Sequence, residues 1–331
     1  MTKSFAAMII DQDEAGRPKG SFREITLADL PDYPVLVEIS HSSLNYKDGL
    51  AISGKGRIAR RTPLIAGIDL AGTVVESRSP EWKAGDKVIV NGWGLSETES
   101  GTFTRFQRLK PEWLAPLPPA FSAEQAMAIG TAGYTAALAV LALEDWGNLF
   151  KGRGDVLVTG AAGGVGSMAI SLLSARGYRV VASTGRASEH DYLRALGAAD
   201  CIDRSEFSTA ARPLQAERWS GAVDSVGSTT LANVVAQTAY GGAVAACGLA
   251  GGSDLPATVL PHILRGVALL GIDSVMAPPE KRRRAWELLS ESLDAEKLAS
   301  MTCVAPMRDL PALAEEIVAG RIRGRVVIEI S

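Results

Sequence analysis

The chain has 331 residues, a formal net charge of -3, 47% hydrophobic residues and three cysteines. Because single hydrophobic cores rarely grow beyond about 250–300 residues, we expect two domains. The evenly mixed charge gives no reason to expect nucleic-acid binding or attraction to a membrane surface, so the expected partner is a small molecule.

The cysteines are widely spaced and odd in number, so they predict neither a disulfide framework nor a CxxC metal site, and we interpret them as reduced core thiols. The apolar run in "MTKSFAAMII" is too short for a secretion signal, and no stretch approaches the roughly 18 apolar residues of a spanning helix. We therefore expect a soluble, cytoplasmic protein.

The first part of the chain, residues 1–122, has short alternating apolar runs separated by Gly and Pro, such as "LVEIS", "LAGTVVE" and "DKVIV". This pattern predicts a β-rich, barrel-like domain. The proline-rich stretch "APLPPAFS" marks its end. The sequence then changes to helical periodicity, beginning with a Ser-x-x-Gln capping box in "SAEQAMAIG".

In the second part, residues 123–276, buried strand patterns such as "DVLVTG", "YRVVAST" and "GGAVAACG" alternate with helical segments. Strands buried on both faces and separated by helices predict a doubly wound parallel sheet. Residues 277–331 contain one more expected helix and end in the strand-like "GRVVIEI", which we expect to return to the first domain. The predicted fold class is therefore α/β.

The clearest local motif is "DVLVTGAAGGVGSMAISLL", in which a strand, a glycine-rich turn and a helix follow one another. Here Ala161, Gly163 and Gly166 occupy the three positions of the G-x-G-x-x-G pattern. Gly163 lets the backbone approach a pyrophosphate, and Gly166 lets helix and strand pack closely. The predicted dinucleotide contacts in this turn are Ala162, Gly163, Gly164, Val165 and Gly166.

The end of the next strand indicates which dinucleotide binds. NAD sites usually place an acidic residue there, which accepts a hydrogen bond from the ribose 2′-hydroxyl. This chain has Ser183, Thr184, Gly185 and Arg186 instead. Hydroxyl and guanidinium groups can donate hydrogen bonds to a 2′-phosphate, so we expect NADPH. The alternative is that Arg186 is a solvated loop residue.

A cluster of polar residues stands in "SLNYKDG" at 43–49, directly after a strand-like run. Tyr46 carries a phenol that can donate a proton or contact a ligand, or it can simply cover a ring. Asn45 and Asp48 have the spacing of an N-cap and an N3 residue, which predicts a helix start. Lys47 is interpreted as a solvent-facing residue of the first turn.

The chain resembles the medium-chain dehydrogenase/reductase superfamily along nearly its whole length. The resemblance rests on "GIDLAGTV", "GTAGYTA", "GAAGGVG" and "DSVG", and on the order of a β-rich domain, a Rossmann domain and a returning tail. The strings "SSLNYKDGLAISGKG", "LRGVALLGIDSV" and "GRIRGRVVIEI" are similar to the NADPH-dependent acrylyl-CoA reductase group. The resemblance implies a GroES-like catalytic domain beside the Rossmann domain.

The sequence departs from the zinc enzymes of this superfamily. Gly67-Ile68-Asp69 stands where those enzymes have Gly-His-Glu, and Asn45 stands near the place of a ligand cysteine. The histidines, at 41, 190 and 262, fall in no ligand spacing. We therefore expect no metal and an acceptor that is already electrophilic, such as an alkene conjugated to a thioester.

The resemblance also implies particular site residues. It places Tyr46 at the nicotinamide and the substrate, with Asn45 and Asp48 as further catalytic candidates. It adds four cofactor contacts, Arg204, Leu249, Ile263 and Ser274, of which the two apolar ones fit a core role equally well. The basic loop "GKGRIARR" suggests contacts from Arg57, Arg60 and Arg61 to the phosphates of coenzyme A, although such loops are usually only solvated.

The expected activity is the NADPH-dependent reduction of a short 2-enoyl-CoA, with acrylyl-CoA as the substrate that the resemblance names. Two alternatives remain open at this point. One is an NADPH:quinone oxidoreductase, which shares the fold and the missing zinc ligands, and the other is a non-catalytic NADPH-binding protein. The superfamily also implies a homodimer, paired through the expected edge strand in "VALLGIDSV".

Overall fold

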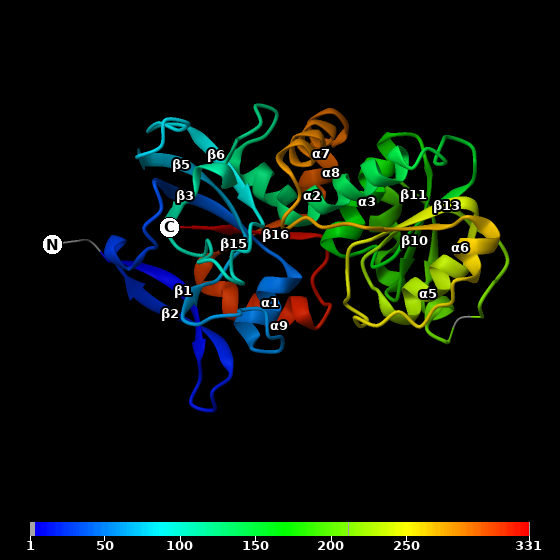
Figure 1. The fold of residues 1–331 in the computed structure, drawn as a ribbon, viewed down its shortest axis with the longest axis horizontal. Helices are drawn as coiled ribbons and strands as arrows, with labels where there is room; N and C mark the ends of the chain where they lie inside the picture. The colour runs from blue at the N-terminus through cyan, green and yellow to red at the C-terminus, as the bar shows by residue number, and fades with distance from the viewer. Residues whose placement is uncertain (1–3, 211, 331) are drawn as a thin grey trace. The chain divides into compact units, whose positions relative to one another are not determined.

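The computed structural model describes residues 4–210 and 212–330. The chain divides into two compact units, residues 1–131 with 302–331 and residues 132–301 (Figure 1). These units differ from the predicted ranges 1–122, 123–276 and 277–331 at residues 123–131, which group with the first unit, and at residues 277–301, which group with the second. The ends of the predicted ranges, residues 1–3 and 331, lie outside the described residues.

The first unit is built on two β-sheets. The larger sheet has the strand order β15-β16-β3-β5-β6-β8, with β7 pairing to β3, and the smaller has the order β2-β1-β4. The strands are β1 Phe5–Gln12, β2 Pro18–Ile25, β3 Val35–Leu44, β4 Leu64–Ile65, β5 Asp69–Ser77, β6 Lys87–Asn91, β7 Phe106–Leu109, β8 Ala115–Pro116, β15 Thr302–Pro306 and β16 Arg325–Glu329. The β-rich character predicted for this part is confirmed.

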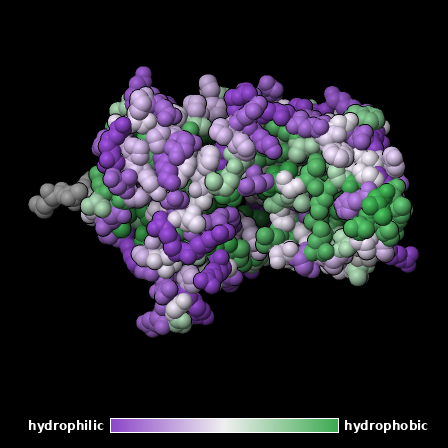
Figure 2. All heavy atoms as spheres, viewed as in Figure 1, coloured by the Kyte–Doolittle hydropathy of each residue, from purple (hydrophilic) through white to green (hydrophobic). Residues whose placement is uncertain are grey.

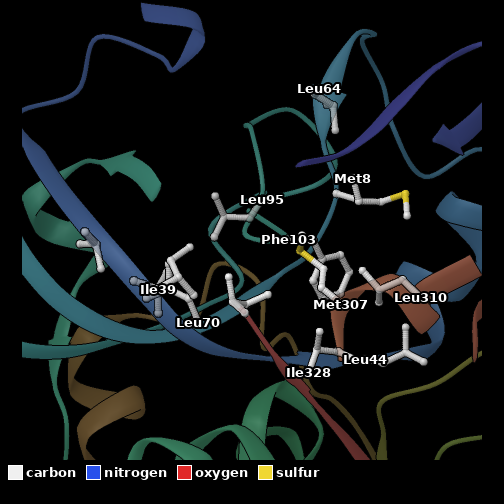
Figure 3. Close-up of a cluster of buried hydrophobic side chains, with 14 of the residues drawn as sticks. Met8, Ile39, Leu44, Leu64, Leu70, Leu95, Phe103, Met307, Leu310 and Ile328 are labelled. Atoms are coloured by element: carbon white, nitrogen blue, oxygen red, sulfur yellow. The ribbon is translucent and has the colours of Figure 1, made fainter. Parts of the chain in front are cut away.

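The core of the first unit joins residues from both ends of the chain. Figure 3 shows Met8, Leu44 and Phe103 beside Leu310 and Ile328, and each of these side chains is at most 1% exposed. Two helices complete the unit, α1 Tyr46–Ser53 and α9 Leu310–Val318, with three short 3-10 turns. Residues 302–330 therefore contribute side chains to the core of the first unit.

The second unit is a six-stranded parallel sheet with the order β11-β10-β9-β12-β13-β14. Its strands are β9 Asp155–Val158, β10 Arg179–Thr184, β11 Ala198–Asp203, β12 Trp219–Asp224, β13 Thr238–Ala246 and β14 Ala268–Gly271. The helices are α3 Gly164–Ala175, α4 His190–Leu196, α5 Ser228–Gln237, α6 Leu260–Arg265, α7 Pro279–Ser292 and α8 Ala295–Ser300. The predicted α/β fold with a doubly wound parallel sheet is confirmed.

Helix α2, Ala123–Asp145, is interrupted at Gly130, whose φ of 48° and ψ of -161° are not helical. Of the helices in the described residues, α2 alone is long and apolar enough to cross a membrane. However, 83% of its most apolar stretch is buried within the protein. It is therefore a core helix, and its break at Gly130 matters for the site described next.

Candidate active site

The glycine-rich turn lies between β9 and α3, as the sequence predicts. Gly160 has a φ of 58°, which L-residues with side chains rarely adopt, and Gly163 is the N-cap of α3. A Cβ at Gly166 would lie 2.6 Å from the Cα of Ala161, so only glycine lets the helix approach the strand this closely. The free backbone N–H groups at the start of α3 suit a pyrophosphate.

The residues after β10 form a second part of the predicted dinucleotide site. Ser183 and Thr184 end the strand and are buried, and the backbone N–H of Arg186 donates to the Thr184 hydroxyl at 3.2 Å. The exposed Arg204 side chain packs against Gly185 so closely that any Cβ there would collide with its Nε and Cδ atoms. The structure thus places Arg204 beside Gly185, the residue that follows β10 and directly precedes Arg186 in the sequence.

The Arg186 guanidinium lies 3.8 Å from the Glu189 carboxylate, and its side chain is 32% exposed. The end of β10 therefore presents two cationic side chains and two hydroxyls, and the Glu189 carboxylate near Arg186 is paired with it. This composition fits a 2′-phosphate better than a 2′-hydroxyl. The remaining predicted cofactor contacts lie in later segments of the second unit. Leu249 is 60% exposed, Ile263 is 68% exposed and Ser274 is half-buried.

In the first unit, α1 begins as the sequence predicts. Asn45 is its N-cap and forms a capping box with Asp48, whose carboxylate accepts from the Asn45 backbone N–H at 2.9 Å. Asn45 is 7% exposed and Asp48 is fully buried, whereas Tyr46 is 37% exposed. Of these three candidates, Tyr46 alone presents substantial surface to a ligand.

The centre of this region is Asp69 at the start of β5, which is fully buried. Its carboxylate accepts five hydrogen bonds of 2.5–2.9 Å. The donors are the Ser43 hydroxyl, the amide groups of Asn45 and Asn91, and the backbone N–H and hydroxyl of Thr131. A carboxylate that accepts so many hydrogen bonds can remain buried, because each donor replaces a bond to water.

Arg325, on β16, is the buried cation of the same cluster. Its guanidinium donates to the Asn45 side-chain oxygen at 3.2 Å, to the Leu44 carbonyl at 3.4 Å and to the Ala128 carbonyl at 2.8 Å. Burial lowers the pKa of Arg325, while the carboxylates of Asp69 and Asp48 oppose that shift. Arg325 therefore ties the start of α1 to the segment before the break in α2.

The break in α2 is required by this cluster. A Cβ at Gly130 would lie 2.5 Å from Nη2 of Arg325 and 2.6 Å from the Ser43 hydroxyl. Since the backbone there is also left-handed, glycine is the residue that the position demands. No sequence pattern described above predicts a site role for Asp69, Gly130 or Arg325. The polar residue inside the apolar string "GIDLAGTV" was the one available signal for Asp69.

The cluster does not suit a zinc ion. Ile68 offers no ligand, Asn45 is bonded through both its oxygen and its nitrogen, and both oxygens of Asp69 already accept hydrogen bonds. In residues 4–210 and 212–330, no group of three or more His, Cys, Asp or Glu side chains is placed to hold a metal ion.

The basic loop lies after α1. Arg57, Arg60 and Arg61 are exposed, and the Arg61 guanidinium donates to the Thr98 carbonyl at 2.5 Å. Lys47, which was interpreted as solvent-facing, forms an ion pair with Glu97. The segment that follows β6 thus contacts both α1 and the basic loop.

Comparisons with known proteins agree with this architecture. Residues 31–119 match the family described as the alcohol dehydrogenase GroES-like domain, and residues 164–291 match the zinc-binding dehydrogenase family. The chain is 48% identical to "Acrylyl-CoA reductase AcuI" of Ruegeria pomeroyi, over 99% of both chains. It is 44% identical to "Putative quinone oxidoreductase YhfP" of Bacillus subtilis, over 93% of this chain and 94% of that protein.

Among solved structures, the yhdH oxidoreductase from Salmonella enterica in complex with NADP superposes with a TM-score of 0.95. The two chains are 46% identical, over 98% of this chain and 100% of the other. The likeness therefore covers both compact units and is not confined to the dinucleotide motif.

Burial raises the pKa of Asp48 to about 7, and the nearby charge of Asp69 acts in the same direction. Because the folded state then holds this proton more tightly than the unfolded chain, stability falls as pH rises from about 4 to about 7. We expect Asp48→Asn, which keeps an oxygen acceptor for Asn45, to remove this loss. Relative to wild type, the variant should gain up to about 1.4 kcal/mol per pH unit in that range.

Urea unfolding of both proteins at pH 5 and pH 7 measures this effect. Asp86→Asn, at a half-buried turn carboxylate whose acceptor position the amide oxygen also retains, serves as the matched control. A difference between Asp48→Asn and wild type that is equal at the two pH values would contradict the expectation.

Proposed function

Because the chain belongs to the medium-chain dehydrogenase/reductase superfamily, we propose that it reduces short 2-enoyl-CoA thioesters with NADPH, most directly acrylyl-CoA to propionyl-CoA. The observation that carries this proposal is the 48% identity to an acrylyl-CoA reductase over 99% of both chains. The glycine-rich turn and the cationic end of β10 support NADPH as the cofactor, in keeping with the NADP complex of the Salmonella relative.

The reaction follows from the chemistry of a conjugated thioester. The bound cofactor supplies a hydride. When hydride adds at Cβ, the π electrons of the alkene shift toward the thioester carbonyl, and a proton then bonds to Cα. The thioester oxygen accepts the developing negative charge, so the alkene is electrophilic without a metal ion. A free carboxylate is a much poorer acceptor because it already carries a negative charge.

Tyr46 is the residue we assign to the reacting groups. Its phenol stands at the first position of α1 and is exposed, so it can order the substrate and donate a proton toward Cα. Asn45 and Asp48 hold Tyr46 in position by capping α1. The hydrogen bond from the Asn45 amide to Asp69 fixes Asn45 in turn. In this proposal Asn45 and Asp48 are positioning residues, because neither has more than 7% of its surface exposed.

Two further features support an acyl-CoA substrate. The exposed guanidinium groups of Arg57, Arg60 and Arg61 follow α1 directly, and they can pair with the phosphates of coenzyme A. By contrast, a quinone has no phosphate for these groups to bind. A quinone remains the second candidate because a 44% identical relative is named a putative quinone oxidoreductase.

The exposed face of the second unit suggests self-association. Val259, Leu264 and Leu269 lie on or beside α6 and the edge strand β14, and they are 66%, 58% and 36% exposed. Figure 2 shows hydrophobic residues gathered over α6. An apolar patch beside an unpaired strand edge favours a homodimer, which light scattering would report as twice the 34.8 kDa chain mass.

The three free cysteines fit a cytoplasmic location.

The substrate assignment can be tested with steady-state rates on acrylyl-CoA, crotonyl-CoA and a benzoquinone, each followed by NADPH absorbance. We expect kcat/KM to be at least about tenfold higher for acrylyl-CoA than for the quinone, because the thioester substrate adds its phosphate contacts. A preference for the quinone would overturn the proposal. NADPH binding without turnover of any of the three would indicate a non-catalytic protein.

The cofactor site can be tested at Arg204 and Arg186. We expect Arg204→Ala and Arg186→Ala each to raise the KM for NADPH about tenfold or more, because a charge-assisted bond to the 2′-phosphate is lost. The KM for NADH should stay within about twofold. Arg194→Ala is the matched control, since this arginine is exposed and pairs with Asp191 on α4. Equal effects on both cofactors would contradict the assignment.

The role of Tyr46 can be tested with Tyr46→Phe. If the phenol donates the Cα proton, kcat should fall by about a hundredfold or more, since a hundredfold is the lower end of the range for general acid catalysis. The melting temperature should stay unchanged, because the ring remains and the hydroxyl is not needed to cap α1. Tyr240→Phe, at a 70% exposed tyrosine, controls for loss of a surface hydroxyl. Full activity of Tyr46→Phe would remove Tyr46 as the donor.

A further inference from the structure

The segment after β6, residues 92–98, has an unusual backbone. Gly92, Trp93, Gly94 and Ser96 all have positive φ values, between 56° and 79°. A left-handed conformation is a genuine outlier for a residue as bulky as tryptophan, and glycine would adopt it without cost. Such conformations persist where the surroundings hold them, and they gather at functional sites.

Contacts on both sides of Tyr46 fix the position of this segment. On one side, Asn91, which precedes it, donates to Asp69 at 2.6 Å, and Asp69 accepts from Asn45 at 2.9 Å. On the other side, Glu97 forms an ion pair with Lys47. Asn45 and Lys47 are the two chain neighbours of Tyr46, so the segment is anchored on both sides of the proposed catalytic phenol.

The same segment also contacts the basic loop. The backbone N–H of Arg60 donates to the Glu97 carbonyl at 2.8 Å, and Arg61 donates to the Thr98 carbonyl. The segment is therefore linked to both chain neighbours of Tyr46 and to two of the arginines proposed to bind the phosphates of coenzyme A. In the proposed reaction, an acyl chain that runs from these arginines to Tyr46 passes close to this segment.

Trp93 and Leu95 are held differently within the segment. Leu95 is 1% exposed and belongs to the core seen in Figure 3, so it anchors the segment from inside. Trp93 packs against the same core and its indole Nε1 is buried, but the residue as a whole is only partly buried. Packing alone would not explain why the largest side chain stands at a position where glycine fits the backbone better.

We propose that Trp93 is the residue that determines acyl-chain length, its indole forming a wall that admits short 2-enoyl groups and excludes longer ones. This inference rests on the proposed reduction of 2-enoyl-CoA and specifies which acyl-chain lengths the site accepts. Aromatic side chains suit this role because they are large and rigid, so they close a space without losing much conformational entropy on binding.

Trp93→Gly is the sharpest test, because it removes the indole and relieves the backbone at once. We expect its kcat/KM for trans-2-hexenoyl-CoA, divided by that for acrylyl-CoA, to rise at least about tenfold over wild type. The KM for NADPH should stay within about twofold. Trp82→Gly is the matched control, since Trp82 is also half-buried against the same core, and its ratio should not change.

A ratio that changes less than twofold in Trp93→Gly would overturn the proposal. An equal fall in kcat/KM for every thioester, with a lower melting temperature, would also overturn it, because it would show that Trp93 serves only in packing. Calorimetric binding of propionyl-CoA and hexanoyl-CoA separates this outcome from failure of the proposed reaction. If wild type turns over no enoyl-CoA, tighter hexanoyl-CoA binding by Trp93→Gly still supports the wall, and unchanged binding rejects it.

Discussion

The buried carboxylate of Asp69 organises the first unit. Its five hydrogen-bond donors come from the end of β3, the N-cap of α1, the end of β6 and the break in α2. A buried charge without such donors would destabilise the fold strongly, so these four segments must meet at one point. The presentation of Tyr46, the left-handed segment around Trp93 and the glycine at 130 all depend on that meeting point.

Arg325 completes the cluster, but its burial beside Asp48 leaves two polar atoms without a hydrogen-bond partner among the described residues, which costs folding free energy. Its Nη2 atom and Oδ1 of Asp48 are both buried, and neither has a hydrogen-bond partner within the part of the chain that the structure describes. Unsatisfied buried polar groups are rare because each one costs free energy, and where they occur they commonly mark sites that serve function rather than stability. This cost is consistent with a cluster whose task is to hold the start of α1 in one orientation.

The dinucleotide motif of the second unit differs from the Asp69 cluster, because its residues lie close together in the sequence. The strand, the turn and the helix that form the phosphate-binding motif lie within residues 155–175, and the residues after β10 follow directly on the next strand. A motif of this kind can be found from the sequence, because spacing along the chain fixes spacing in space. Arg204 is the exception: the family resemblance alone implied it as a cofactor contact, and the structure places its side chain against Gly185.

The sequence by itself determined the two-part architecture, the dinucleotide turn and the capped start of α1, because each depends on residues a few positions apart. It also supplied the family resemblance, from strings spread over the chain. Only the tertiary structure decided which polar residues lie at the centre of the first unit. Arg325 and Asn45 are 280 positions apart, and Asn91 and Asp69 come from neighbouring strands. No local pattern records such pairs, since they form only when the sheet and the returning tail bring distant segments together.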